Sequence, residues 1–302
     1  METQNNVEGY EMEENWLVYV NGEMVPMRDA KISVFDRSFQ YGDGVFEGLR
    51  AYKGLIFKLR EHVDRLYRSA AAIRIDIPLT KEEFSNAIKR VVRENRFSDA
   101  HIKPQVSRGN AFKLGLNPFN TTKPNIVIPA RPIGESLFKT EGFKLATANV
   151  RKIPAMCLDP RIKSSIYLVQ ILARFDAMAV GADEAIMLDI HGNISEGCGD
   201  NIFVVKNGEL YTPPAWQALE GITRAVVIEM AKREGYRVHE TQLTLYDAYT
   251  ADEVFITGSA AGIISVTEVD RIVISQGAPG KITQKLAILY KEEVKKGESA
   301  YE

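Results

Sequence analysis

The chain has 302 residues, of which 45% are hydrophobic and 26% are charged. This balance is typical of a globular protein and excludes a disordered, collagen-like or coiled-coil chain. The 38 basic and 40 acidic side chains give a formal net charge of −2, and no basic stripe suggests nucleic-acid binding. No apolar run approaches the roughly 20 residues that a membrane-spanning helix needs.

The length predicts two domains. The pattern breaks and polar residues gather over residues 134–141, which we expect to link an N-terminal domain of residues 14–133 to a larger C-terminal domain of residues 142–302. Residues 1–13 are acidic and polar, so we expect a flexible tail. They are unlike a secretory signal, which favours a cytoplasmic protein.

The N-terminal half begins with a hairpin pattern. Alternating residues from Trp16 to Val20 lead into Asn21-Gly22, a pair typical of a type I′ turn. Thr80 and Glu83 form a capping box that opens a helix running to about residue 95. An amphipathic helix over residues 61–73 and strands over 102–107 and 125–130 complete this half. The long loop between those two strands is a candidate functional loop.

The C-terminal half mixes strands, helices and a second hairpin, whose turn is Asn207-Gly208. Strands are expected over residues 143–149, 184–189 and 253–257, and helices over 164–180, 222–235 and from about 283. Hairpins and helices without a strict strand–helix–strand rhythm favour the α+β class.

Lys163 and Glu196 are the first candidates for chemistry. Lys163 precedes a strongly apolar helix, and burial there would favour a neutral amine that attacks carbonyl groups. A surface lysine is the ordinary alternative. Glu196 lies in a glycine-rich bend between two strands, where a ligand can approach the backbone closely. An ordinary turn would have the same composition.

Two further stretches are suited to anions. Leu219-Glu-Gly-Ile-Thr-Arg224 opens a helix directly after a glycine, so free N–H groups and the helix dipole favour a phosphate, although a plain capped helix is the commoner case. Gly258 to Gly262 follows a strand with small residues only. A lysine, a carboxylate and two anion cradles together are what pyridoxal 5′-phosphate requires.

Metal chemistry is not expected. Cys157 and Cys198 do not have zinc-site spacing, and none of the four histidines is spaced from another as a metal ligand would be. We expect both thiols to be reduced.

Six motifs in order resemble the fold-type-IV pyridoxal-phosphate enzymes, and most closely the branched-chain aminotransferases. The resemblance covers roughly Trp16 to Lys295. The motifs are YGDGVFEGLRAY (41–52), LREHVDRL (59–66), RIKSSIYL (161–168), ISEGCGDNIFVVKNGELYTPP (194–214), LEGITR (219–224) and DEVFITGSAAGI (252–263). It implies two domains with the cofactor between them, and a homodimer in which the loop over residues 109–120 completes the neighbour's pocket.

The resemblance also implies roles for residues. Lys163 would form the Schiff base and move the proton, Glu196 would bond the pyridine nitrogen, and Tyr167 would bond the cofactor's 3′-oxygen. The other implied cofactor-binding residues are Arg60, Leu219, Gly221, Ile222, Thr223 and Ser259. The implied substrate-binding residues are Tyr41, Phe46, Gly48, Arg37, Lys103, Arg108, Ala260 and Ala261.

The departures from the branched-chain pattern concern the substrate. Those enzymes commonly have arginine where this chain has Lys103, and Thr-Ala-Ala-Glu where it has Ser259-Ala-Ala-Gly262. Lysine keeps the charge but loses the bidentate fork. The segments around Arg37 and Arg108 resemble the D-amino-acid aminotransferases instead.

We therefore expect an enzyme that moves the amino group of leucine, isoleucine or valine to 2-oxoglutarate. A D-amino-acid or (R)-amine transaminase is the first alternative, and an aminodeoxychorismate lyase is a weaker one. A catalytically idle pyridoxal-phosphate carrier is the last alternative, and the intact candidate residues argue against it.

Overall fold

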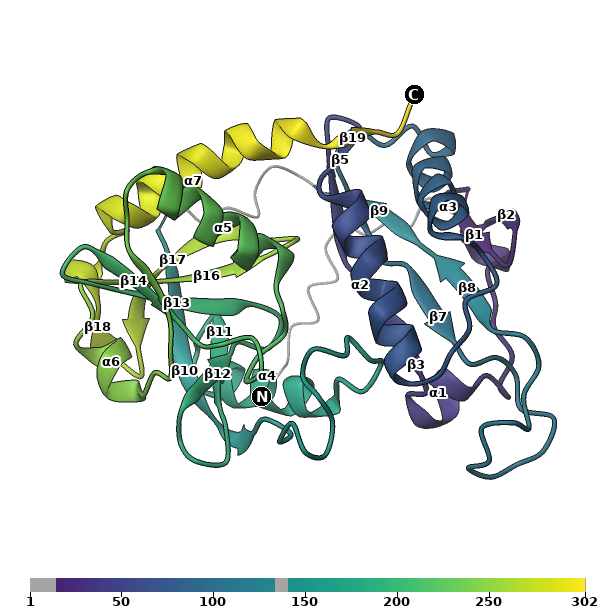
Figure 1. Ribbon diagram of the computed structural model, residues 1–302, viewed down its shortest axis with the longest axis horizontal. Coiled ribbons are helices and arrows are strands. Elements are labelled where there is room, and N and C mark those ends of the chain that lie inside the picture. Colours follow the sequence, from purple (N-terminus) through teal and green to yellow (C-terminus); the bar gives the residue numbers. More distant parts are fainter. Residues whose placement is uncertain (1–14, 134–140, 302) are drawn as a thin grey trace, which may run out of the picture.

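The chain forms two domains, which lie side by side in Figure 1, each with helices packed on β-sheet. The computed structural model describes residues 15–133 and 141–301. The expected flexible tail lies outside the described residues, and so does the expected linker except for Glu141. The exact domain boundaries therefore stay predictions.

The N-terminal domain contains two sheets, with strand orders β2-β1-β8-β7-β3 and β19-β5-β4-β6-β9 among the described residues. The strands are β1 (Leu17–Val20), β2 (Glu23–Pro26), β3 (Gly44–Phe46), β4 (Leu49–Tyr52), β5 (Leu55–Ile56), β6 (Ala100–Ile102), β7 (Gln105–Ser107), β8 (Asn125–Ile128), β9 (Ala130–Pro132) and β19 (Glu298–Ser299). The helices are α1 (Arg37–Tyr41), α2 (Leu59–Ala72) and α3 (Lys81–Glu94), with a 3-10 turn η1 (Met27–Asp29).

The C-terminal domain contains one mixed sheet in the order β12-β11-β10-β17-β16-β13-β14-β15, with β18 paired to β17. Its strands are β10 (Phe143–Arg151), β11 (Glu184–Leu188), β12 (Ile194–Glu196), β13 (Asn201–Lys206), β14 (Glu209–Thr212), β15 (Val238–Glu240), β16 (Glu253–Gly258), β17 (Gly262–Val269) and β18 (Ile272–Val273). Its helices are α4 (Leu168–Ala179), α5 (Ile222–Arg233), α6 (Leu245–Tyr249) and α7 (Lys281–Glu293), with 3-10 turns η3 (Ser275–Gly277) and η4 (Val294–Lys296).

The locally encoded features are confirmed. Asn21 and Gly22 both have positive φ, 51° and 108°, as the turn between β1 and β2 requires. Thr80 and Glu83 form the expected capping box, in which the Thr80 N–H donates to the Glu83 carboxylate at 2.7 Å.

Proline and local hydrogen bonding shift several boundaries. The run over residues 102–107 is two strands of different sheets, β6 and β7, separated at Pro104, which has no N–H to give to a ladder. In the same way Pro129 separates β8 from β9. The helix expected from residue 164 begins only at Leu168, because residues 164–167 continue the loop in which Lys163 lies.

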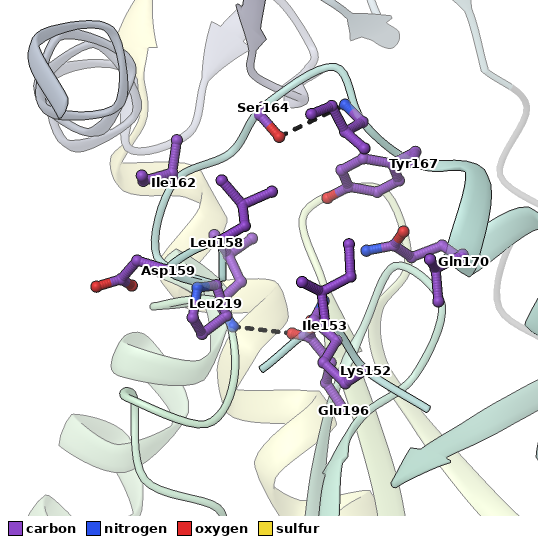
Figure 2. A pocket seen from close by; sticks show the side chains of 13 residues that line it. Lys152, Ile153, Leu158, Asp159, Ile162, Ser164, Tyr167, Gln170, Glu196 and Leu219 are labelled. Carbon is purple, nitrogen blue, oxygen red and sulfur yellow. Dashed lines mark hydrogen bonds and ion pairs between the residues drawn. The ribbon is translucent and has the colours of Figure 1, made fainter. Parts of the chain in front are cut away.

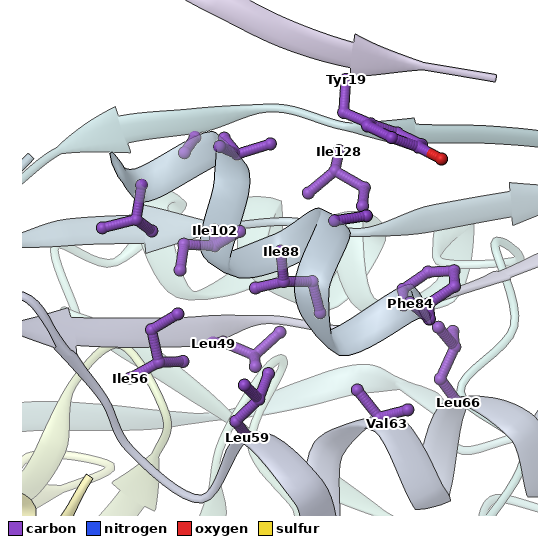
Figure 3. Packing of buried hydrophobic residues seen from close by; sticks show 14 of the residues in the cluster. Tyr19, Leu49, Ile56, Leu59, Val63, Leu66, Phe84, Ile88, Ile102 and Ile128 are labelled. Atoms are coloured by element: carbon purple, nitrogen blue, oxygen red, sulfur yellow. The ribbon is translucent and has the colours of Figure 1, made fainter. Parts of the chain in front are cut away.

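The core of the N-terminal domain fixes α2 and α3 on the sheets (Figure 3). Leu49 of β4, Leu59 and Leu66 of α2 and Phe84 of α3 have no exposed surface and point into one cluster. Each such side chain contributes about 1.5–3 kcal/mol to folding. The cluster thereby holds α2 where Arg65 reaches the Glu220 carbonyl of the C-terminal domain.

The end of the chain returns to the N-terminal domain. In Figure 1, α7 extends across the top of the molecule and leads to β19, which pairs with β5 through Glu298 and Ser299. The last strand thus completes an N-terminal sheet, although the expected division gave residues 142–302 to the other domain. No helix in the described ranges combines the length and apolarity needed to cross a membrane.

Candidate active site

A cavity of about 190 Å³ lies between the two domains. It brings together most of the residues singled out from the sequence. Those that line it are Phe46, Gly48, Lys163, Tyr167, Leu219, Gly221, Ile222, Thr223, Ser259 and Ala260. No aspartate or glutamate is among the described residues of its lining, whereas Arg65, His101 and Lys163 are, so the cavity favours anions.

Lys163 sits in the loop before α4 and is fixed to the N-terminal domain by its backbone. Its N–H donates to Ser69 Oγ at 3.1 Å, and its carbonyl accepts the N–H of Phe46 at 3.0 Å. Burial of the amine, followed by the nearby Arg65 guanidinium, lowers the pKa of Lys163 to about 8. A substantial fraction of this amine is therefore neutral near physiological pH, as a nucleophile requires.

Tyr167 lies beside the amine. Its hydroxyl is 3.1 Å from Lys163 Nζ, and its ring packs edge-on against Phe46 at 4.9 Å between centroids. Burial, and then the charge of Glu196, raise the pKa of Tyr167 to about 12. The phenol therefore keeps its proton and can donate to an oxygen of a ligand.

Glu196, at the end of β12, is buried beside the cavity in a small hollow of about 30 Å³ (Figure 2). Tyr167 and Leu219 line both spaces. One oxygen of Glu196 accepts the Leu219 N–H at 2.9 Å, and the other forms an ion pair with Lys152. A buried carboxylate needs such partners to remain ionised. Lys152 was not among the residues predicted from the sequence, since no motif surrounds it.

The anion cradle is formed by backbone. Helix α5 begins after Gly221 with no side chain capping its N–H groups, which leaves them to a ligand. A Cβ on Gly221 would lie 1.8 Å from Asn201 Oδ1, so a larger residue here would displace the Asn201 side chain. Thr257 Oγ1 is buried without a hydrogen-bond partner in the described structure, and Thr257 lines the cavity.

The expectation for Arg60 is corrected by the structure. Arg60 is exposed on α2, and Arg65 lines the cavity instead. The two positions differ by about 140° around the helix. Arg65 is 4% exposed and donates from Nε and Nη2 to Glu47 at 2.6 and 2.8 Å, and from Nη1 to the Glu220 carbonyl at 2.7 Å. His62 Nδ1 lies 2.7 Å from the same Glu47 carboxylate.

Five residues expected to bind substrate are absent from the described lining of the cavity, and three of them, Arg37, Arg108 and Tyr41, belong to one cluster around Asp43. Arg37 and Arg108 both form ion pairs with Asp43, at 2.8 Å. Burial opposes ionisation of that carboxyl, but the hydrogen bonds from Arg108 and Arg37 prevail and lower its pKa. Tyr41 is 40% exposed and stacks its ring near the Arg37 guanidinium. In this chain, the arginines are engaged in a structural cluster.

Lys103 and Ala261 lie next to the lining rather than in it. Lys103 Nζ is 5.1 Å from the centroid of the Phe46 ring, and burial, followed by the charge of Lys163, lowers its pKa. His101 does line the cavity. The unusual His-Ile-Lys sequence therefore contributes its histidine to the cavity and its lysine to the edge.

The residues present fit pyridoxal phosphate. The Lys163 amine, of lowered pKa, suits the aldehyde, and the Glu196 carboxylate, paired with Lys152, suits the pyridine nitrogen. The Tyr167 phenol suits the ring oxygen. The uncapped start of α5 and the Thr257 hydroxyl, unpartnered among the described residues, suit the phosphate. Within residues 15–133 and 141–301, no cluster of histidine, cysteine, aspartate and glutamate could hold a metal ion, and both cysteines are free.

Known proteins resemble this chain over nearly its whole length. The profile of the family "Amino-transferase class IV" matches residues 44–269. A Methanocaldococcus jannaschii protein provisionally named a branched-chain-amino-acid aminotransferase is 50% identical over 91% of this chain and 95% of its own. The branched-chain-amino-acid aminotransferase of Pseudomonas aeruginosa is 37% identical over 91% of each chain.

The solved structures agree. The T.th. branched-chain amino acid aminotransferase complexed with N-(5′-phosphopyridoxyl)-L-glutamate superposes with a TM-score of 0.89 at 39% identity, covering 93% of this chain and 94% of its own. The chain belongs to the class IV aminotransferases. It is a fold-type-IV enzyme whose cofactor is pyridoxal 5′-phosphate.

Proposed function

We propose that this enzyme transfers the amino group of leucine, isoleucine or valine to 2-oxoglutarate. The observation that carries the proposal is the Lys163 amine, whose pKa is lowered and which lies 3.1 Å from the Tyr167 hydroxyl. The cavity around this amine has no aspartate or glutamate among its described lining residues. The names of the relatives and of the superposed structures support branched-chain substrates.

The protein's own groups divide the work. When bound, pyridoxal phosphate supplies an electron sink for charge on the substrate's α-carbon. Lys163 Nζ would be the nucleophile that holds the cofactor and the base that carries the α-proton. Glu196, which pairs with Lys152, would accept the N–H of the cofactor's pyridine ring. The uncapped start of α5 and Arg65 would hold the phosphate.

The proposed preference for branched-chain substrates rests on the residues that line the cofactor cavity. Phe46 and Gly48 offer an apolar surface, and the small residues at Ser259 and Ala260 allow a carboxylate to approach the backbone. The ion pairs of Arg37 and Arg108 with Asp43 weigh against the D-amino-acid alternative, because these arginines already have a carboxylate partner.

We further propose that the enzyme works as a homodimer in the cytoplasm. Leu168, Leu172 and Phe175 of α4 are exposed, and a second copy of the chain would cover this apolar face. Phe112 and Phe119 in the loop over residues 109–120 are also exposed, as expected if this loop reaches the neighbour's cavity. The cytoplasmic location rests on the sequence composition alone.

A spectral half-reaction tests the substrate. The purified holoenzyme is mixed with L-leucine or D-alanine separately, and the visible absorbance of the lysine-bound cofactor is followed. Rapid loss with L-leucine only is expected. Loss with D-alanine only would establish the D-amino-acid alternative. Release of many pyruvates per site from aminodeoxychorismate, with no amino acceptor present, would establish the lyase.

Matched lysine variants complete the test. Lys163→Ala should abolish the visible band of the bound cofactor, while Lys144→Ala, which removes an exposed amine, should preserve it. A normal band in Lys163→Ala would refute the assignment of the nucleophile. A normal band in the wild type, with no turnover of any amine, would favour the idle-carrier alternative.

A further inference from the structure

A second and larger cavity, of about 540 Å³, lies between β4, β5 and the C-terminal end of α7. Tyr52 and Leu55 come from the N-terminal domain, and Tyr290 and Val294 come from α7 and η4. In Figure 1 this is the region where α7 crosses toward β5. None of its described lining residues is shared with the cofactor cavity.

Two tyrosine hydroxyls at this cavity are buried without hydrogen bonds. Neither Tyr52 Oη nor Tyr290 Oη has a hydrogen-bond partner in the described structure, although Thr223 and Tyr52 are near enough to influence the pKa of Tyr290. Burial raises the pKa of both phenols, so both remain donors. A buried polar group that lacks a partner destabilises the fold, and an acceptor on a ligand would remove that cost.

The charges around the cavity favour an anion. Arg50, Lys53, Lys291 and Lys295 contribute four cationic side chains to its lining, against the single described carboxylate of Asp99. Lys295 also pairs with Glu292, outside the lining, and Arg50 and Lys291 have interaction partners as well. The formal charge of the described lining is nevertheless positive. A positive lining whose walls are mostly apolar suits a ligand that combines an acidic group with a hydrocarbon body.

Arg50 connects this cavity to the cofactor cavity. Its guanidinium lies 4.5 Å from the centroid of the Tyr52 ring, and Nη1 donates to the Ala260 carbonyl at 2.8 Å. Ala260 lines the cofactor cavity. One side chain thus forms part of the wall of the second cavity and supports the turn after β16.

We propose that this cavity is a second binding site, separate from the cofactor site, for a small organic anion with an apolar body, such as a carboxylate. The acidic group lies among the rim lysines, the hydrocarbon body packs on Leu55 and Val294, and the buried phenols donate to the ligand's oxygens. The site goes beyond the proposed transamination and does not depend on it.

A pair of fluorescent probes tests the proposal on the holoenzyme without any amino substrate. The probes are 1-anilinonaphthalene-8-sulfonate and N-phenyl-1-naphthylamine, which share one apolar body and differ by the anionic group. Wild type is expected to bind the anionic probe at one saturable site per chain. Lys53→Gln should weaken that probe about threefold and leave the neutral probe unchanged, and Lys281→Gln, at the far end of α7, should alter neither.

Cavity-filling variants locate the site. Val294→Trp should weaken the anionic probe by about tenfold or more, whereas Ile288→Trp, at a position 65% exposed on α7, should not. Leu55→Trp fills the cavity from the other domain, and so covers the case in which Val294→Trp fails to fold. Unchanged binding in a folded Val294→Trp or Leu55→Trp enzyme would overturn the proposal. So would equal binding of the two probes in wild type, because it would show that the anionic group contributes nothing.

Discussion

Glu47 has a buried carboxyl group that faces the buried guanidinium of Arg65 and the buried imidazole of His62. Arg65 and His62 both contact it within 2.8 Å, and none of the three residues is more than 4% exposed. The Arg65 guanidinium outweighs the burial and holds the pKa of Glu47 well below its usual range. The carboxylate is therefore charged at every working pH.

We predict that Glu47→Gln destabilises the protein by about 3–5 kcal/mol, the cost of leaving a buried charge without its partner. It should also weaken cofactor binding, because Arg65 loses the contact that orients it. Urea unfolding of the apoprotein and titration with pyridoxal phosphate measure the two effects. Glu61→Gln, exposed on α2, is the control, and equal behaviour of both variants would contradict the prediction.

Lys163 should show its lowered pKa in the kinetics of cofactor capture. Burial disfavours the charged amine, so the neutral fraction rises as pH approaches about 8. The rate at which apoprotein captures pyridoxal phosphate should increase about tenfold per pH unit below this value and level off above it. Stopped-flow absorbance measures the rate. A rate still rising at about pH 10, the ordinary range of a lysine, would indicate an exposed amine.

The candidate site was predictable where chemistry is carried by a local motif. Lys163, Glu196 and the start of α5 could be found because a motif surrounds each of them. Arg65 also lies in a motif, LREHVDRL (59–66), but that motif contains two arginines, Arg60 and Arg65, and does not indicate which of them is buried. Apolar residues such as Val63 and Leu66 mark the side of α2 that faces its own domain, but Arg65 is buried because the other domain covers a second, polar side. Periodicity within one helix carries no signal for that contact.

At the scale of elements, the start of α5 depends on one missing side chain. Gly221→Ala would place a Cβ 1.8 Å from Asn201 Oδ1, and Asn201 in turn holds the Leu219 carbonyl at 3.0 Å. We predict that this variant binds pyridoxal phosphate at least about tenfold more weakly, measured by equilibrium titration. Glu229→Ala, at an exposed position of the same helix, should bind normally. Equal affinities would show that the cradle tolerates a methyl group.

Elements whose signals are local were predicted correctly, and those that depend on distant partners were not. The Asn-Gly turns and the Thr80 cap are set within a few residues. The division of residues 102–107 between two sheets depends instead on which strands lie across from them, β4 and β9 on one side and β3 and β8 on the other. The return of β19 to β5 likewise had no local signature.

For the whole molecule, the apolar face of α4 predicts the assembly. Phe175, 62% exposed, lies with Leu168, Ile171, Leu172 and Met178 on one stripe of this helix. We predict that Phe175→Glu converts the proposed dimer to a monomer, observed by sedimentation velocity. Ile288→Glu, similarly exposed on α7, should not. A wild-type monomer, or a dimeric Phe175→Glu variant, would place the interface elsewhere.

The pairing of β19 with β5 has a consequence for synthesis on the ribosome. The edge of β5 that receives Glu298 and Ser299 stays open until those residues leave the exit tunnel, long after the rest of the N-terminal sheet has been made. Domains generally fold as they emerge, and an open strand edge can pair with another chain. For most of translation, this nascent chain therefore carries an incomplete sheet, which is completed only when Glu298 and Ser299 pair with β5.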